Sequence, residues 1–109
     1  MNADVKRADG TLVARCRVAR TPWTRARGLL GRSTLARDEG MLFPGTGSIH
    51  MLFMRFAIDA VFCDRELVVL KVVRGLRPWR MASARGATVV IELAAGAADD
   101  LEPGVQLVL

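Results

Sequence analysis

GMLFPGTGSIHMLFMRFAIDAVFC, residues 40–63, is the stretch that decides the fold of this chain. It contains all four phenylalanines, three of the five methionines and the only histidine. Because large apolar side chains fill protein interiors, most of the core material lies here. The few polar residues set among them, His50, Arg55 and Asp59, are therefore the first candidates for a functional site.

The apolar side chains of this stretch change phase along the chain. They occupy odd positions from Ile49 to Phe53 and even positions from Phe56 to Phe62. Each half has the period of a strand with one apolar face. Since a strand cannot change faces without a bend, bulge or turn, we expect an irregular element at Met54 to Ala57. Arg55 falls inside it.

Upstream, the sequence predicts a β-hairpin. Residues 11–20 place apolar side chains at every second position, with arginines between some of them, which indicates a half-buried strand. Asp9-Gly10 is a turn signal, so residues 3–7 are expected to pair with that strand.

Downstream, further strands are expected at residues 66–73, 88–93 and 105–109. The first of them is apolar on both faces, which is typical of a central strand. Between the first two, residues 74–87 are interpreted as a long loop that carries four arginines and Trp79. Residues 97–101 are expected to make a helical turn.

One helix is expected, at about residues 22–31. Thr21 suits an N-cap, Pro22 the first helical position and Gly31 the C-terminus, with an apolar stripe between them. The sequence therefore predicts a mainly β protein, α+β at the margin. We expect a small sandwich or barrel of about seven short strands in one domain, residues 1–109.

The charge is unevenly distributed. The chain has a net charge of +5, but residues 1–37 carry +7 and residues 38–109 carry −2. A basic N-terminal third can attract nucleic acid, acidic proteins or anionic lipid. A solvated basic face is the plainer interpretation, because no more than two basic residues are consecutive.

Cys16 and Cys63 lie in apolar, strand-like runs and are expected to behave as small buried side chains. Two cysteines with one histidine are a poor zinc set, so no metal and no cofactor are expected. The first twenty residues have no apolar signal segment, and the apolar runs are too short to span a membrane. We expect a cytoplasmic protein, monomeric or weakly dimeric.

Four blocks carry a resemblance to a known family. They are Arg27-Gly28-Leu29-Leu30-Gly31-Arg32, Gly40-Met41-Leu42-Phe43, Ile58-Asp59 with Phe62, and Val90-Ile91-Glu92-Leu93 with Ala95-Gly96. In this order they resemble domain of unknown function 192. The resemblance implies a mainly β fold with a sandwich-like core and a short helix, and it implies no activity. Many members carry Phe-Trp-Met-Lys-Asn-Thr before Pro-Leu-Asp; here only Met51 and Asp59 match that pattern.

The candidate site is a polar cluster set among apolar residues. Its members are Arg27, Arg32, His50, Arg55, Asp59, Trp79 and Glu92. A buried carboxylate requires a partner, and Arg27 or Arg32 could pair with Glu92 as a latch between helix and sheet. The Gly-rich loop 44–48 could hold an anion on its backbone N–H groups, or it could be a plain connection.

Three functions remain open. The leading hypothesis is a non-catalytic accessory domain that binds a small ligand or a protein partner through loops 44–48, 54–57 and 76–87. The second is a small enzyme with an acid/base site at His50 and Asp59. The third is nucleic-acid binding through the basic loop 74–87, with Trp79 between Arg77 and Arg80.

Overall fold

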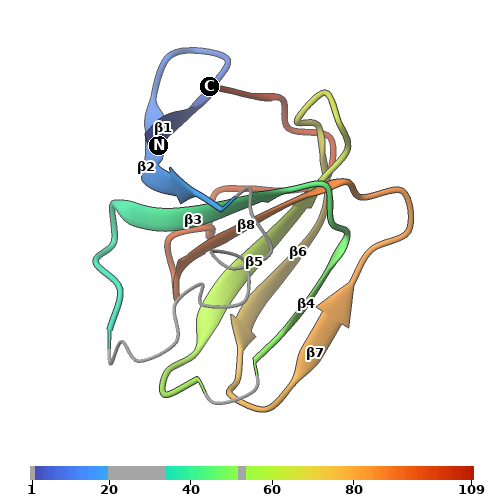
Figure 1. The fold of residues 1–109 in the computed structure, drawn as a ribbon. Helices are drawn as coiled ribbons and strands as arrows, with labels where there is room; N and C mark the ends of the chain where they lie inside the picture. The colour runs from blue at the N-terminus through green and yellow to red at the C-terminus, as the bar shows by residue number, and fades with distance from the viewer. Residues whose placement is uncertain (1, 20–33, 52–53) are drawn as a thin grey trace.

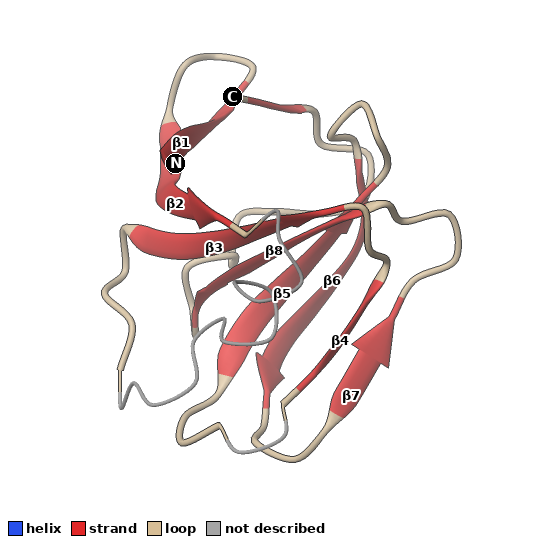
Figure 2. Cartoon of the chain, in the orientation of Figure 1, coloured by secondary structure: helices blue, strands red, loops and turns tan. Residues whose placement is uncertain are grey.

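A computed structural model of the chain describes residues 2–19, 34–51 and 54–109. These residues form strands and contain no helix, so none of their segments is a helix able to cross a membrane (Figures 1 and 2). The helix expected at 22–31 lies outside the described residues. The strands are β1 (Asn2–Arg7), β2 (Leu12–Val18), β3 (Glu39–Pro44), β4 (Ser48–His50), β5 (Ile58–Cys63), β6 (Val69–Leu76), β7 (Met81–Ser83), β8 (Val89–Ala94) and β9 (Leu107–Val108).

Seven of these strands form one curled sheet in the order β6-β5-β8-β3-β2-β1-β9. Neighbours are antiparallel except β2 and β3, which run parallel. The other two strands, β4 and β7, pair with each other and lie beside β6 in Figure 1. We call this antiparallel pair, Ser48–His50 with Met81–Ser83, the ribbon.

The two ends of the curled sheet meet at one corner. The Val69 N–H donates to the Val105 carbonyl at 2.9 Å, and the Leu107 N–H donates to the Leu67 carbonyl at 3.0 Å. Residues just before β9 therefore bind residues at the start of β6. The sheet is a half-barrel joined at this corner, and the expected mainly β class is confirmed.

Two apolar cores lie on opposite faces of the sheet. One includes Val61, Ile91 and Leu93, together with buried residues of β1 and β2. The other includes Phe62 and Val90, and it is covered by Ile49 of the ribbon among others. Every residue of β5 and of β8 is buried, because these strands contribute to both cores.

The central-strand prediction for residues 66–73 was wrong. The strand occupies Val69–Leu76 and ends the sheet order, with only its first and last residues fully buried. An apolar run does not distinguish a central strand from an edge strand that other segments cover. Here the Lys71 Nζ donates to the Ser83 carbonyl of the ribbon at 2.9 Å.

Other expectations can be compared directly. The hairpin is confirmed, with Ala3 opposite Cys16 across the turn at Asp9-Gly10. The irregular element is confirmed, because residues 54–57 belong to no strand. The long loop at 74–87 was wrong, because β6 extends into it and β7 lies within it. Residues 97–101 form turns without a helix.

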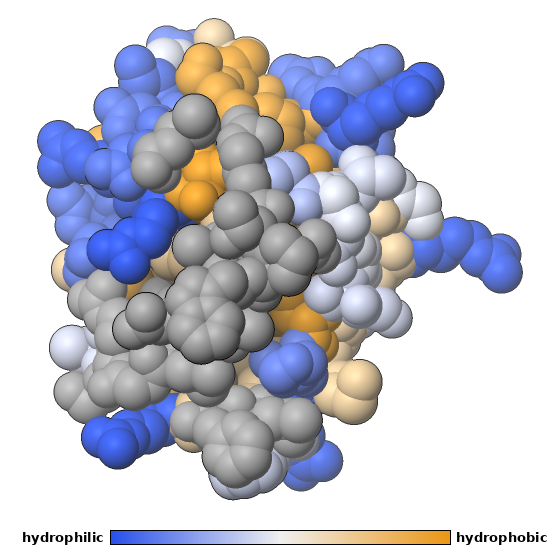
Figure 3. Space-filling model, in the orientation of Figure 1, coloured by the Kyte–Doolittle hydropathy of each residue, from blue (hydrophilic) through white to orange (hydrophobic). Residues whose placement is uncertain are grey.

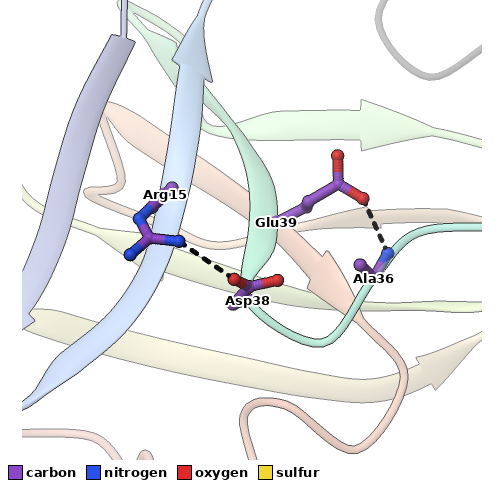
Figure 4. Close-up of polar contacts among 4 residues, drawn as sticks. All are labelled: Arg15, Ala36, Asp38 and Glu39. Carbon is purple, nitrogen blue, oxygen red and sulfur yellow. Dashed lines mark hydrogen bonds and ion pairs between the residues drawn. The ribbon is translucent and has the colours of Figure 1, made fainter.

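The start of β3 is fixed by polar contacts (Figure 4). Arg15 lies 3.2 Å from Asp38 in an ion pair, and the Ala36 N–H donates to Glu39 Oε1 at 3.0 Å. Both partners of the ion pair are exposed, so it contributes well under 1 kcal/mol in the order-of-magnitude sense. The parallel register of β2 and β3 depends mainly on backbone hydrogen bonds and burial.

Gly40 provides the first test of this packing. It lies on β3 between Cys16 and Leu93, and a Cβ there would lie 2.8 Å from the Glu92 carbonyl oxygen and 2.9 Å from the Cys16 Sγ. We expect Gly40→Ala to lower the free energy of unfolding by about 2 kcal/mol through overpacking. Urea unfolding measures this, and an unchanged midpoint would show that the two neighbouring strands can separate without cost.

Candidate functional site

Asp59 is buried, and both of its carboxylate oxygens accept hydrogen bonds from the backbone. Its side chain belongs to β5 and is 1% exposed. Oδ1 accepts from the Gly75 N–H at 2.9 Å, and Oδ2 accepts from the N–H groups of Gly96 and Ala98, each at 3.0 Å. Asp59 therefore holds the end of β6 and the turn after β8 against β5.

Arg74 holds the same turn through its carbonyl groups. Its Nη2 donates to the carbonyl oxygens of Ala98, Asp99 and Leu101. The turn at 95–101 is thus bound by a carboxylate at its N–H groups and by a guanidinium at its carbonyls. This arrangement satisfies the polar groups of a turn that packs Ala98 and Leu101 into the core.

Glu92 is also buried, but its surroundings differ. It is 6% exposed and lies on β8 between Met41 of β3 and Ala60 of β5. Within the described ranges its carboxylate has no hydrogen bond or ion pair, and burial raises its pKa to about 7. The predicted partners Arg27 and Arg32 lie outside those ranges, so the latch stays a prediction.

His50 lies apart from the buried carboxylates. It is exposed on β4, where its cross-strand partner is Met81. No hydrogen bond or ion pair joins it to Asp59 or Glu92 in the part of the chain that the structure describes. An acid/base pair of His50 and Asp59 therefore has no direct contact in this arrangement.

The other candidate chemistry is weaker still. Cys16 and Cys63 are free thiols buried in the core, and burial raises the pKa of each to about 12, so neither is a good nucleophile. Residues 2–19, 34–51 and 54–109 contain no cluster of three His, Cys, Asp or Glu side chains suited to a metal. In the Gly-rich loop, the N–H groups of Gly45 and Thr46 both donate to the Thr88 carbonyl, so they are not available to an anion.

The ribbon has one inward and one outward face. Ile49 and Ala82 are cross-strand partners that pack on the second core. Because side chains alternate, the next pair, His50 and Met81, points outward, and Met81 is 75% exposed. Sequence reasoning missed this face, because Met-Ala-Ser gives no strong strand signal.

The turn before β7 presents Trp79. The Arg80 N–H donates to the Arg77 carbonyl at 3.3 Å, with Pro78 and Trp79 between them. The backbone is fixed by Met51, whose carbonyl accepts from Trp79 and whose N–H donates to Arg80. Trp79 has a φ of 69° and its side chain is 59% exposed, which is unusual for a large aromatic residue.

Cations surround this turn. Arg77 and Arg80 flank Trp79 and are exposed, and exposed Arg55 follows the segment that contacts the turn. The sequence segments 40–58 and 67–91 contain no Asp or Glu. Hydrophilic side chains project from the flank where the ribbon lies in Figure 3, among residues of intermediate hydropathy. We define the ribbon face as His50, Met81, Arg77, Trp79 and Arg80.

Acidic groups meet the ribbon only at its other end. A groove there is lined by Asp64, Arg65, Glu66, Gly86 and Thr88. A second groove, of about 360 Å³, lies between the β1–β2 turn and the turn after β8, and its wall combines Arg7 and Arg37 with Asp38 and Asp100. Neither has the single sign of charge found at the ribbon face.

These features define a small half-barrel with an attached two-stranded ribbon. The chain belongs to the family DUF192, domain of unknown function 192, which is described as "Uncharacterized ACR" and whose model matches residues 4–109. The resemblance seen in the sequence is confirmed. No curated protein matches the chain.

Two solved structures share the fold. One is a protein of unknown function from Novosphingobium aromaticivorans, with 25% identity and a TM-score of 0.84, covering 100% of this chain and 84% of that one. The other, from Sinorhizobium meliloti, is described as a "putative transcription regulator". It has 25% identity and a TM-score of 0.82, covering 96% of this chain and 89% of that one.

Proposed function

We propose that this chain is a non-catalytic binding domain whose ribbon face binds an anionic partner. One observation carries the proposal: an exposed tryptophan and methionine lie among exposed arginines in segments that contain no carboxylate. Large exposed apolar side chains with cations beside them are typical of binding surfaces.

The chemistry of the buried groups supports a role in binding over one in catalysis. Both oxygens of Asp59 accept backbone hydrogen bonds, and the two thiols have high pKa values. A general base has to lie within hydrogen-bond reach of the group that it deprotonates. His50, on the outer face of the ribbon, is better placed to contact a partner.

Charge supports an anionic partner. Arg77 and Arg80 are exposed, and no described residue forms an ion pair with either of them. Their attraction for an anion therefore does not have to displace an internal carboxylate. The description of the Sinorhizobium meliloti protein as a "putative transcription regulator" agrees with a partner of this charge.

Heparin, a flexible polyanion without bases, tests the proposal. We expect Arg77→Gln combined with Arg80→Gln to weaken heparin binding about tenfold at low salt, because two exposed cations at the surface are removed. Isothermal titration at several salt concentrations measures the affinity and its salt dependence. The two substitutions should leave the unfolding midpoint nearly unchanged, since both side chains are exposed.

A matched control removes the same charge elsewhere. Arg17 on β2 and Arg65 in the turn after β5 are also exposed, so Arg17→Gln combined with Arg65→Gln changes the net charge equally. This control should bind heparin nearly as the parent does. Equal weakening in both double variants would show that total charge acts without a defined surface, and the proposal would be wrong.

A further inference from the structure

We infer that the anionic partner of the ribbon face is a single-stranded nucleic acid whose bases stack on Trp79. This inference rests on the proposed function and adds the chemical class of the partner. Proteins that bind single strands combine cations for the phosphates with exposed aromatic rings for the bases. The ribbon face has both elements within one turn.

The backbone of the turn points to a role for the ring. Pro78 and Trp79 occupy the central positions of a turn closed by Arg77 and Arg80, and a φ of 69° at the second central position normally requires glycine. A bulky side chain in this conformation costs about 1–2 kcal/mol. Since 59% of Trp79 is exposed, burial offsets only part of that cost. A ring held in this way is available to a partner.

The surrounding groups suit a nucleotide. Arg77 and Arg80 lie on both sides of Trp79 in the sequence and can reach phosphates or stack on a base. His50, opposite Met81 on the ribbon, adds a second ring. A duplex would offer phosphates but would keep its bases stacked inside, so a single strand uses the ring and the cations together.

Competing anionic occupants use less of this surface. An acidic protein or a heparin-like chain would engage the arginines without requiring an aromatic ring. An anionic membrane could accept Trp79 and Met81, but two exposed apolar side chains provide little area for insertion. The ring flanked by cations is therefore best explained by bases.

Fluorescence anisotropy can separate the ring from the charge. The probes are a labelled twelve-nucleotide deoxythymidine strand and an abasic strand with the same twelve phosphates. We expect the parent protein to bind the base-bearing strand about tenfold more tightly than the abasic strand. A twelve-base-pair duplex should bind no more tightly than the abasic strand.

Variants at Trp79 keep the test independent of folding. Trp79→Gly removes the ring and also relieves the positive φ, so the variant should fold at least as well as the parent. We expect it to lose about tenfold in affinity for the base-bearing strand and to bind the abasic strand as the parent does. Trp79→Phe should retain most of the affinity. Loss of both affinities to the same extent would overturn the inference.

The outcomes distinguish the two proposals. If heparin binds through Arg77 and Arg80 but the two strands bind equally, the proposed function stands and the inference fails. If neither heparin nor any strand binds, both are wrong. Binding to vesicles of phosphatidylcholine with phosphatidylserine, but to neither strand, would overturn the inference in favour of a membrane.

Discussion

Asp59→Ala is expected to lower the free energy of unfolding by about 4 kcal/mol. The substitution leaves the N–H groups of Gly75, Gly96 and Ala98 without their acceptor. Each buried donor left unsatisfied costs about 1–3 kcal/mol, and the interactions lost here involve a charged acceptor. Urea unfolding monitored by circular dichroism measures the change.

Asp64→Ala is the matched control for this experiment. Asp64 also accepts two backbone N–H groups, from Glu66 and Val68, but it does so in a surface turn where water can replace it. We expect a loss of about 1 kcal/mol. Similar losses in the two variants would mean that burial of the Asp59 carboxylate adds nothing. An Asp59→Ala protein with full stability would contradict the structural role proposed for this residue.

Glu92→Gln is expected to stabilise the protein at pH 8 and to leave it nearly unchanged at pH 4. Burial raises the pKa of Glu92 from 4.5 to about 7, so folding favours the protonated carboxyl group. The stabilising effect of the protonated group is fully present below pH 4.5. It is lost as the pH rises towards 7, because the unfolded chain ionises first. The whole difference is about 3 kcal/mol.

The measurement is the free energy of unfolding of both proteins from pH 4 to pH 8. Other ionisable groups titrate in both proteins, so the difference between the two curves isolates Glu92. Glu102→Gln, at an exposed position, should give a difference that does not vary with pH. A flat difference for Glu92→Gln would show that the ionised carboxylate is compensated in the folded protein.

Local patterns predicted those parts of the fold whose signals lie close together in the sequence. The hairpin of β1 and β2 follows from alternation and Asp9-Gly10, and the irregular segment before β5 follows from a change of phase. The edge position of β6 could not be predicted in this way. It depends on which segments cover the strand, and the covering residues come from the ribbon and from residues 104–107.

The candidate site was predictable in its residues more than in their roles. Asp59 and Glu92 were recognised as carboxylates among apolar residues, and the structure places both in the interior. The donors to Asp59 come from residues 75, 96 and 98, which no local pattern connects with position 59. Trp79 was singled out by its neighbouring arginines, whereas the positive φ of its turn is visible only in the structure.

The pairing of β9 with β1 has a consequence for biosynthesis. Lys6 pairs with Val108 and Arg7 with Leu107, so the first strand to leave the ribosome waits for the last one. Until then one edge of β1 is open, and open strand edges invite pairing with other chains. Since contacts between distant parts of a sequence also form slowly, we expect the half-barrel to close only after residue 108 has emerged.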